Sequence, residues 1–553
     1  MKIVTAQLNY TIGDMAGNAN KIIDVIATQG NRADLIVFSE LCITGYYPKD
    51  LLDREGFIDA QMLELDRIKK ATEGMNSAIV VGVVMRNPMA GKKHLNALLF
   101  IEDGMVIYQY NKQLLPTYGV FDEARHFEPG GQVGAMTWRG KRVGFLICED
   151  AWEDAGKPLY QKDPVAQLAD CNCDVIVSIN ASPYNIYKRQ SRAEVIKNIV
   201  KTCDCDVVYV NQVGGIDDLV FDGNSRIMRS NGYWISEAPE FEESVDFVDI
   251  RRQAPVDCRP DVSMKLMVKQ LVMGLRDYCV KSGFKQVLVG SSGGIDSAVT
   301  LAICALAMGP ENVVAVTMPS KYSSAGSVDD SVSLCAALGV ELVESPIKET
   351  FEVEIQSYTE AFGEAPSGLA QENLQARIRG QRLMTLSNST GAMVVSTGNK
   401  TELSVGYCTL YGDMAGGLSI LADLYKGQVY DMANYLNEWE FRREVIPFAI
   451  ITKEPSAELA EGQADTDSLP PYDQLDAYLQ LILEGDLLNL DERLVLEGIA
   501  GEMPIEDKDR VRKMLDRNEY KRRQAPPLIR VNRRSFGADR QIPLTINYST
   551  KRL

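Results

Sequence analysis

Residues 287–299 read Val-Leu-Val-Gly-Ser-Ser-Gly-Gly-Ile-Asp-Ser-Ala-Val, and this stretch decides the fold of the region around it. Its apolar, β-branched start predicts a buried strand, the Ser/Gly turn ends that strand, and a helical pattern begins at Ile295. A strand, a turn and a helix in this order aim backbone N–H groups at one point, which suits a phosphate. No lysine follows the turn as in the Walker loop, and Asp296 stands where a magnesium ligand is needed.

The rest of the chain alternates strands and helices on both sides of this loop. Helical patterns at 20–29 and 58–75 separate several apolar runs in the N-terminal half. Such alternation predicts largely parallel sheets covered by helices. We expect an N-terminal domain at 1–246, a linker without periodicity at 247–262 and a second domain at 263–553. The predicted strands lie near 35–38, 78–84, 143–147, 174–179, 206–210, 286–290, 313–318, 340–344 and 392–397.

Composition limits the possible functions. A chain of 553 residues, 45% hydrophobic and 24% charged, is typical of a soluble globular protein with two or three domains. The net charge of −18 argues against nucleic-acid or acidic-membrane binding, and no apolar run is long enough for a membrane span. Eleven scattered cysteines without a secretory leader predict free thiols in the reducing cytoplasm. The two histidines, His94 and His126, are too few to favour a Ser-His-Asp hydrolase or a His-rich metal enzyme.

Three residues in the N-terminal half could form a nucleophilic site. Glu40 and Cys148 each follow the end of a predicted strand, where parallel α/β folds gather their sites, and Lys112 lies between them in sequence. With Glu40 as base and Lys112 reducing the cost of negative charge, Cys148 could attack an amide and form a thioester. Spacing alone does not distinguish this site from a small buried cysteine that only packs.

The segments around these residues resemble the Glu-Lys-Cys signature of the nitrilase superfamily, which processes amides through a cysteine thioester. They read Phe38-Ser39-Glu40-Leu41-Cys42, Lys112-Gln113-Leu114-Leu115-Pro116-Thr117-Tyr118-Gly119-Val120-Phe121-Asp122-Glu123 and Ile147-Cys148-Glu149-Asp150. The second segment is similar to the glutaminase domain of glutamine-dependent NAD+ synthetases. The resemblance implies an αββα sandwich in which Glu40, Lys112 and Cys148 are catalytic and Glu123 assists the lysine. It also implies that Tyr118, Ser182 and Lys188 hold glutamine.

The C-terminal region resembles the same family. The loop at 290–297 is similar to that of the N-type ATP pyrophosphatases, and Ser396–Tyr407, Tyr411–Gly417, Asp423–Val429 and Lys453–Leu459 match the NAD+ synthetase pattern. The implied fold is a Rossmann-like parallel α/β domain of the adenine nucleotide α-hydrolase type. The resemblance implies ATP contacts from Gly290, Ser291, Ser292, Gly293, Gly294, Ile295, Asp296, Ser297, Thr397 and Lys426, with Ser456 as an additional candidate.

The same resemblance implies a metal ion and a dinucleotide. Asp296 and Glu402 would lie near Mg2+, which accompanies ATP as co-substrate. Asn373, Glu402, Asp413 and Lys521 would bind deamido-NAD+, which the locally basic tail also suits. Arg377 and Arg379 are two residues apart, so on a helix they point to different sides, and we expect one of them to form a salt bridge.

Together the motifs imply a two-site enzyme that takes ammonia from glutamine and uses ATP to amidate deamido-NAD+, with an internal route for ammonia. We expect a cytoplasmic homo-oligomer that binds neither nucleic acid nor membrane. Two alternatives stay open: another glutamine-fed ATP pyrophosphatase, such as a GMP- or asparagine-forming enzyme, and a metabolite sensor without activity. The pairs Cys171/Cys173 and Cys203/Cys205 could mimic a zinc site, although their one-residue spacing favours packing.

Overall fold

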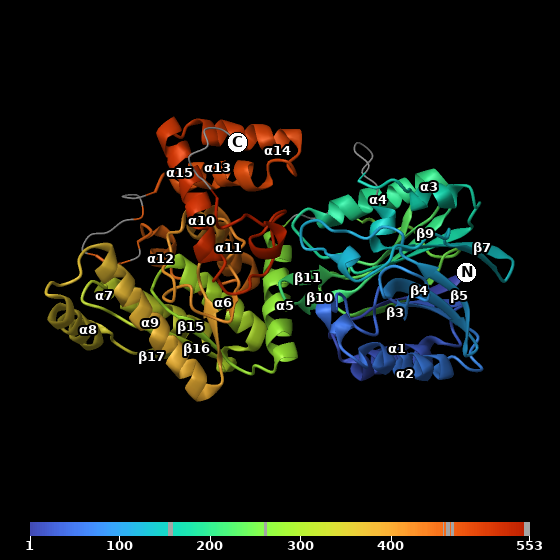
Figure 1. Cartoon of the computed structure of the whole chain (residues 1–553), viewed down its shortest axis with the longest axis horizontal. Helices are drawn as coiled ribbons and strands as arrows, with labels where there is room; N and C mark the ends of the chain where they lie inside the picture. The colour runs from blue at the N-terminus through green and yellow to red at the C-terminus, as the bar shows by residue number, and fades with distance from the viewer. Residues whose placement is uncertain (153–158, 259–262, 457, 461–464, 466–468, 547–553) are drawn as a thin grey trace. The chain divides into compact units, whose positions relative to one another are not determined.

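The computed structural model describes residues 1–553 apart from 153–158, 259–262, 457, 461–464, 466–468 and 547–553. The chain divides into two compact units, Met1–Val262 and Ser263–Leu553 (Figure 1). None of the described helices combines the length and apolar character that crossing a membrane requires.

The first sheet of unit 1 is mixed. Strands β1, β2 and β3 run parallel, whereas β4 pairs antiparallel with β3, β5 pairs antiparallel with β4, and β14 pairs antiparallel with β1. The order is β14-β1-β2-β3-β4-β5. The bounds are β1 Lys2–Gln7, β2 Leu35–Val37, β3 Ala78–Arg86, β4 His94–Glu102, β5 Met105–Asn111 and β14 Ser244–Asp249.

The second sheet has a similar plan. Strands β7, β8 and β9 run parallel, and β6, β12 and β13 extend the sheet in antiparallel pairs. Its order is β13-β12-β9-β8-β7-β6, and a separate hairpin joins β10 and β11. The bounds are β6 Ala135–Trp138, β7 Lys141–Ile147, β8 Val175–Asn180, β9 Asp206–Asn211, β10 Val213–Ile216, β11 Leu219–Asp222, β12 Arg226–Met228 and β13 Trp234–Glu237.

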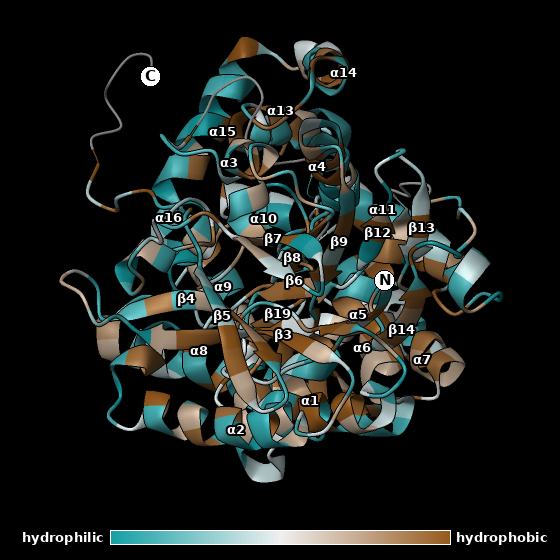
Figure 2. Ribbon diagram, turned by 90° about the vertical axis from the view of Figure 1, so that its right-hand side faces the viewer, coloured by the Kyte–Doolittle hydropathy of each residue, from teal (hydrophilic) through white to brown (hydrophobic). Residues whose placement is uncertain are grey.

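Unit 1 is a four-layer αββα sandwich, as the resemblance implies. One apolar cluster joins the facing sides of the two sheets, including Val37 and Val80 from the first and Phe145 and Val208 from the second. Helices α1 (Met15–Gln29) and α2 (Phe57–Ala71) cover the outer face of the first sheet, and α3 (Pro164–Ala169) and α4 (Lys188–Cys203) cover that of the second (Figure 1). Figure 2 shows hydrophobic residues along strands such as β3 and hydrophilic residues on exposed parts of helices such as α2.

Two sequence expectations need correction. Residues 247–249 belong to β14 rather than to a linker, because Phe247, Val248 and Asp249 pair in register with Val4, Ile3 and Lys2. The sheets of unit 1 are also less parallel than expected, since β4 and β5 return as a hairpin rather than through helices.

Unit 2 contains a parallel sheet in the order β17-β16-β15-β18-β19. The predicted strands near 286–290, 313–318, 340–344 and 392–397 are confirmed as β15 Val287–Gly290, β16 Val313–Thr317, β17 Glu341–Glu344 and β18 Met393–Ser396, and β19 (Leu418–Ser419) adds a short edge. Their C-terminal ends meet at one edge, where the Ser/Gly loop leads into α6 (Ile295–Met308).

The other helices of unit 2 surround this sheet and extend beyond it. Helices α13, α14 and α15 lie together in Figure 1. The bounds are α5 Met264–Ser282, α7 Ala325–Leu338, α8 Lys348–Phe362, α9 Leu369–Thr390, α10 Lys400–Val405, α11 Lys426–Tyr435, α12 Phe448–Thr452, α13 Tyr472–Glu484, α14 Leu490–Gly501, α15 Ile505–Arg517 and α16 Glu519–Arg522.

Candidate active sites

A buried lysine between two carboxylates forms the centre of the site in unit 1. Lys112 follows β5, and its Nζ lies 2.8 Å from Glu40 Oε1 and 2.7 Å from Glu123 Oε1. All three side chains are fully buried. Asn96 Nδ2 and the Ala181 N–H donate to Glu40 at 2.7 and 3.0 Å, and the Tyr46 hydroxyl donates to Glu123 at 2.7 Å. These contacts fix both carboxylates around the ammonium group.

Cys148 begins the first turn after β7, at the C-terminal end of a central parallel strand. Its φ of 45° is a left-handed conformation that few non-glycine residues adopt, so its backbone is held by the fold in a strained turn. The residue is 5% exposed. Burial and the charge of Glu40 raise the pKa of the Cys148 thiol, while the Lys112 ammonium lowers it. The resting group is therefore a thiol and needs a base before it can act as a nucleophile.

The charges of the cluster explain why Lys112 stays protonated. Burial alone would lower the pKa of Lys112, but the negative charges of Glu123 and Glu40 outweigh it and hold the pKa well above its usual value. Burial raises the pKa of Glu123, against the opposing effect of Lys112. An ammonium, a carboxylate and a thiol thus lie in one dry site, which suits proton transfer from a thiol.

A second polar cluster lies next to Cys148 and was only partly foreseen from the sequence. The Tyr118 hydroxyl donates to both oxygens of Glu149, at 2.8 and 3.0 Å, and the Tyr160 hydroxyl donates to Oε1 at 2.9 Å. Lys188, at the start of α4, lies 3.5 Å above the Trp152 ring and acts electrostatically on Glu149. The sequence analysis named Tyr118 and Lys188 but missed Glu149. The position of Glu149, directly after the candidate nucleophile Cys148, could have pointed to it.

Ser182 belongs to the same region through a rigid backbone. Its N–H donates to Asn211 Oδ1 at 2.9 Å, and its carbonyl accepts from the buried Arg192 at 2.9 Å. Arg192 is in turn paired with the buried Asp222. This network holds the 180–183 segment in place after β8, beside the Ala181 N–H that contacts Glu40.

The Ser/Gly loop of unit 2 is held in shape by hydrogen bonds between its own N–H groups and hydroxyls. The Ser292 N–H points to Ser297 Oγ at 3.3 Å, and the Gly294 N–H points to Ser292 Oγ at 3.2 Å. Gly293 has a φ of 75°, and a Cβ there would lie 2.3 Å from the Ser327 carbonyl oxygen. The turn therefore needs glycine at 293 both for its backbone angle and for its close contact with α7.

Two carboxylates converge on one lysine next to this loop. Lys426, the first residue of α11, places Nζ 2.6 Å from Asp296 Oδ2 and 3.0 Å from Glu402 Oε1. Asn399 caps α10 and donates to Asp296 Oδ1 at 2.8 Å. Burial, with a contribution from Asp296, raises the pKa of Glu402 to about 7, against the lowering effect of Lys426. The two carboxylates thus surround the Lys426 ammonium group.

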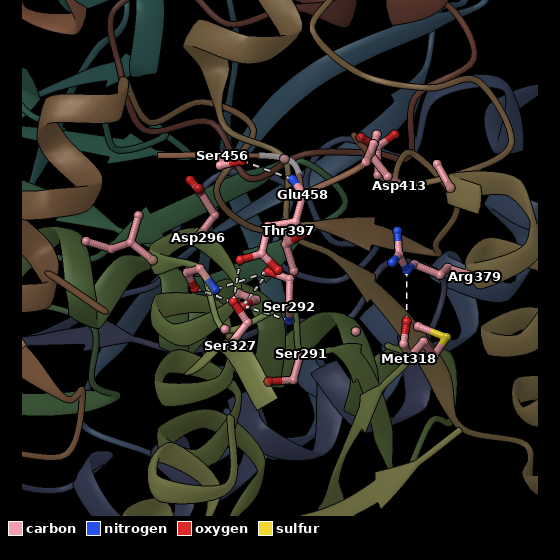
Figure 3. A pocket seen from close by; sticks show the side chains of 18 of the residues that line it. Ser291, Ser292, Asp296, Met318, Ser327, Arg379, Thr397, Asp413, Ser456 and Glu458 are labelled. Atoms are coloured by element: carbon pink, nitrogen blue, oxygen red, sulfur yellow. Dashed lines mark hydrogen bonds between the residues drawn. The ribbon is translucent and has the colours of Figure 1, made fainter. Parts of the chain in front are cut away.

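A pocket of about 280 Å³ opens over the loop (Figure 3). All of the loop residues at 290–297 line it, together with Thr397, Glu402, Asp413, Lys426 and Ser456. Figure 3 shows Ser291, Ser292, Asp296 and Thr397 on one side, and Arg379 near Met318 on the other. The structure brings these predicted residues to one place.

Arg379 lines this pocket, a role that sequence reasoning did not assign to it. Its Nε donates to the Met318 carbonyl oxygen at 3.1 Å, whereas Arg377 donates to the Leu410 carbonyl oxygen at 3.2 Å. Among the described residues, the partners of both arginines are backbone carbonyl oxygens and neither arginine forms an ion pair, so the prediction of a salt bridge is wrong. Because the Arg379 guanidinium is buried, its pKa is lowered to about 10.

Two predicted dinucleotide residues lie outside the set that lines the pocket. Asn373 accepts a hydrogen bond from the Thr409 hydroxyl at 2.6 Å. Lys521 donates to the carbonyl oxygens of Gly406 and Cys408, both at 2.8 Å. Asp413, which does line the pocket, accepts from the Thr409 N–H at 2.6 Å, and burial raises its pKa to about 6.

The paired cysteines of unit 1 are packing residues in this structure. Cys173, Cys203 and Cys205 are buried in the apolar cluster under α3 and α4, and Cys171 packs against it. All eleven cysteines are free thiols. Among the described residues, these four thiols do not form a group close enough to share one metal ion.

Comparison with known proteins identifies both halves. The carbon-nitrogen hydrolase family matches residues 2–259, and the NAD synthase family matches residues 267–525. The glutamine-dependent NAD(+) synthetases of Synechocystis sp. and Acinetobacter baylyi are 39% and 40% identical to the chain, with 98% of each chain covered in both comparisons. These matches favour the interpretation as an NAD+ synthetase over both alternatives raised by the sequence.

Solved structures agree with these relatives. A glutamine-dependent NAD+ synthetase from Acinetobacter baumannii, in complex with adenosine diphosphate, is 38% identical over 98% of both chains with a TM-score of 0.76. One from Cytophaga hutchinsonii, 20% identical over 98% of this chain and 97% of its own, has a TM-score of 0.80 and shows the shared fold. With full-length identity to the curated relatives and both domain families present, the chain belongs to the family of glutamine-dependent NAD(+) synthetases.

Proposed function

We propose that the chain converts deamido-NAD+ to NAD+, with glutamine as the nitrogen donor and ATP as the activating co-substrate. The observation that carries this proposal is the presence of two chemically complementary sites in one chain. One places a thiol beside a buried Glu-Lys-Glu cluster, and the other places a Ser/Gly anion loop beside Asp296 and Lys426.

In unit 1, Cys148 is the nucleophile and Glu40 the base. Glu40 takes the thiol proton, sulfur attacks the side-chain amide carbon of glutamine, and Glu40 returns the proton to the amide nitrogen, so that ammonia leaves as the glutamyl thioester forms. Water then attacks the thioester, which releases glutamate and restores the thiol. Lys112 remains an ammonium throughout, because Glu40 and Glu123 raise its pKa, and it stabilises negative charge on the tetrahedral intermediate.

The polar cluster beside Cys148 supports glutamine as the substrate. Glutamine carries an α-ammonium and an α-carboxylate in addition to its amide. Glu149, buried and aligned by Tyr118 and Tyr160, is the group that would pair with the ammonium. Lys188 would pair with the carboxylate, and the fixed 180–183 segment with Ser182 would position the side chain.

In unit 2, the loop at 290–297 and Lys426 would hold the phosphates of ATP. The nicotinate carboxylate of deamido-NAD+ attacks the α-phosphorus of ATP, and pyrophosphate leaves. This activation is needed because a free carboxylate is a poor acylating group. Ammonia then attacks the adenylate, which gives NAD+ and AMP. Loop N–H groups and hydroxyls that turned to the departing pyrophosphate would supply electrostatic stabilisation. Thr397, Ser456 and Arg379 line the same pocket and would contact the nucleotide.

The donor set at Asp296 and Glu402 fits Mg2+. Both are carboxylates, which this hard cation prefers, and both already converge on a single cationic atom, Lys426 Nζ. Bound there, Mg2+ would supply charge neutralisation on the phosphates and the leaving pyrophosphate. Lys426, released from the two carboxylates, would then turn to the phosphate oxygens. Asn399 holds Asp296 in place by its hydrogen bond to Oδ1.

We further propose a binding surface for deamido-NAD+, a cytoplasmic location and self-association. Asn373, Asp413 and Lys521 surround the Thr409 turn and would bind deamido-NAD+ together with Glu402. Free thiols support a reducing, cytoplasmic compartment. Exposed Leu490, Leu494 and Val495 on α14 support association with a second copy of the chain, which light scattering tests.

Two variants test the assignment of the sites. Cys148→Ala is expected to abolish glutamine-dependent NAD+ formation and to keep ammonium-dependent formation, whereas Asp296→Ala keeps glutaminase activity and stops AMP production. Cys171→Ala, which changes a thiol away from the site, serves as the matched control and should behave like the parent chain. Loss of both activities in a folded Cys148→Ala protein would contradict the two-site assignment.

A further inference from the structure

One buried carboxylate of unit 1 takes no part in the proposed chemistry. Asp150 lies in the helical turn Cys148–Ala151, two residues after the proposed nucleophile, and is 1% exposed. Burial raises the pKa of Asp150 to about 6, although its hydrogen bonds and the Lys112 ammonium oppose this effect. The group is therefore a carboxylate at neutral pH. A charge kept away from water is costly, so this one needs partners that justify it.

The Asp150 carboxylate holds the chain on both sides of Lys112. Oδ1 accepts hydrogen bonds from the N–H groups of Gln113 and Leu114, at 2.9 and 2.8 Å. Oδ2 accepts a hydrogen bond from the Tyr110 hydroxyl at 2.8 Å, and Tyr110 lies on β5, two residues before the lysine. The position of the Lys112 backbone is thus tied to Asp150 from before and after.

The same carboxylate holds the turn that presents the nucleophile. Oδ2 also accepts from the N–H of Ile147, the residue before Cys148, at 3.1 Å. Cys148 has a φ of 45°, and a strained turn of this kind persists only when the surrounding contacts hold it. Lys112 follows β5 of the first sheet, whereas Cys148 follows β7 of the second. Asp150 therefore joins the two sheets at the place where their reactive groups meet.

The set of partners requires a carboxylate rather than any polar side chain of this size. The four donors are three backbone N–H groups and one phenol. An ionised carboxylate only accepts, and its two oxygens have enough lone pairs for all four. An asparagine would turn its NH2 group either to the N–H groups of Gln113 and Leu114 or to the N–H of Ile147. A backbone N–H cannot accept, so either orientation loses hydrogen bonds.

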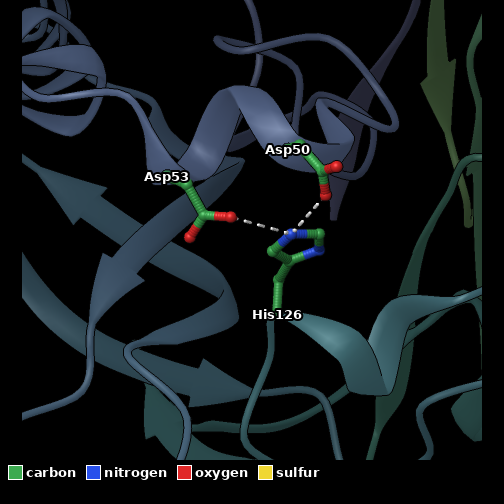
Figure 4. A group of neighbouring side chains, drawn as sticks. All are labelled: Asp50, Asp53 and His126. Carbon is green, nitrogen blue, oxygen red and sulfur yellow. Dashed lines mark ion pairs between the residues drawn. The ribbon is translucent and has the colours of Figure 1, made fainter.

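An exposed group of carboxylates in unit 1 shows the contrast. Asp50 and Asp53 face the His126 ring from a neighbouring turn (Figure 4). Both aspartate side chains are more than half exposed, and both ring nitrogens have partners, the Tyr47 hydroxyl at Nδ1 and the aspartates at Nε2. Water screens ion pairs of this kind, and they hold elements together only weakly. The hydrogen bonds of Asp150 are shielded from water and are correspondingly stronger.

We propose that Asp150 is a positioning residue for the glutaminase reaction, which sets the distance of the Cys148 thiol from Glu40 and Lys112. The inference rests on the proposed role of Cys148 as the nucleophile. Asp150 acts through these groups and neither binds glutamine nor moves a proton. Its loss leaves every reacting group in the chain but displaces the thiol from its base, and small displacements of reacting groups have large effects on rates.

Alkylation of Cys148 by iodoacetamide measures this arrangement without glutamine. The reaction is followed by mass spectrometry of the peptide that contains Cys148. Its amplitude counts the molecules with an intact site, and its rate constant reports how well Glu40 takes the thiol proton. In Asp150→Asn the amplitude should equal that of the parent chain, and the rate constant should fall by about tenfold to a hundredfold. Ammonium-dependent NAD+ formation, which belongs to unit 2, should not change.

Three further variants act as graded test and controls. Tyr110→Phe removes only one of the four donors, so the rate constant should fall by a smaller factor. Tyr108→Phe, on the same strand, removes a hydrogen bond to the Val133 carbonyl oxygen and is its matched control. Asp174→Asn removes the acceptor of the Arg142 N–H at the other end of β7, and controls for the loss of a carboxylate.

Two results would overturn the proposal. A reduced amplitude with the parent rate constant would mean that Asp150 only stabilises the fold, and a rate constant equal to that of Asp174→Asn would mean that it does not set the site. If Asp150→Asn does not fold, Tyr110→Phe decides, and a rate constant equal to that of Tyr108→Phe refutes the positioning role. Failure of the proposed function is a separate outcome, because the parent chain would then release no ammonia from glutamine whatever the alkylation rates.

Discussion

At the residue scale, the cluster of Lys112, Glu40 and Glu123 holds two negative charges and one positive charge away from water. A buried carboxylate is tolerated only when it is paired, so the single lysine stabilises both of its neighbours. Removal of one carboxylate leaves a neutral pair, but removal of the lysine leaves two unpaired carboxylates. The two kinds of substitution should therefore differ in cost.

Lys112→Met is expected to lower the free energy of unfolding by about 3–5 kcal/mol at neutral pH, and Glu123→Gln by clearly less. The pKa of Glu123 is already raised by burial, and loss of the ammonium raises it further. In Lys112→Met the folded state then binds protons that the unfolded state releases, so its deficit relative to the parent chain shrinks as pH falls through that raised pKa. Denaturant unfolding between pH 5 and 8 measures this; equal losses for the two variants would contradict the argument.

Glu149 offers a second prediction at this scale. If its carboxylate pairs with the α-ammonium of glutamine, Glu149→Gln should raise KM for glutamine by about ten- to a hundredfold, the value of one charge-assisted hydrogen bond. Ammonium-dependent synthesis should not change. Tyr160→Phe, which removes only one hydrogen bond to Glu149, is the control with a smaller effect. A large fall in kcat with an unchanged KM would instead place Glu149 in the chemistry at Cys148.

At the element scale, the Ser/Gly loop depends on one backbone position. An alanine at 293 would place its Cβ 2.3 Å from the Ser327 carbonyl oxygen and would also have a φ of 75°. The clash is with backbone at the start of α7, so the loop itself must move. At Gly294 the nearest atom to such a Cβ is Ser292 Oγ at 3.3 Å, and the φ is not left-handed.

Gly293→Ala is therefore expected to lower ATP-dependent NAD+ formation by at least about a hundredfold, since small displacements of positioning groups have effects of that size. Gly294→Ala should retain most of the activity, and glutaminase activity should survive in both variants. Steady-state rates with ammonium and ATP measure the first effect, and glutamate release measures the second. Similar losses in the two alanine variants would show that the loop tolerates no change at all, against the geometric argument.

The elements differ in how well the sequence predicts them. The central parallel strands β7, β8, β15 and β16 are buried on both faces, so continuous apolar runs mark them. Strand β5 is largely exposed and β14 alternates, so their places depend on partners distant in sequence. This is why residues 247–249 were taken for a linker.

The candidate sites show the same division. Motifs identify Glu40, Lys112, Cys148 and Asp296 because the chemistry restricts the residue types. Glu149 and Arg379 are defined instead by what the fold brings beside them, namely two tyrosines and the Met318 carbonyl.

At the scale of the whole molecule, each unit has its own apolar core. The clusters that include Phe145, Val81 and Ile196 lie entirely within unit 1, and those that include Tyr425, Leu403 and Val316 lie entirely within unit 2. A chain with two independent cores of this size is not expected to unfold as one cooperative system. A ligand stabilises the unit that binds it by mass action, and the gain grows with the logarithm of the ligand concentration relative to Kd.

Calorimetry of the full chain should therefore resolve more than one transition. A non-hydrolysable ATP analogue at a hundred times its Kd should raise the transition of unit 2 by about 5 °C or more and leave that of unit 1 unchanged. Lys112→Met should lower only the transition of unit 1, and Gly293→Ala should abolish the response to the analogue. A single transition whose calorimetric and van't Hoff enthalpies agree would contradict independent cores, because it would mean that the two units lose their structure together.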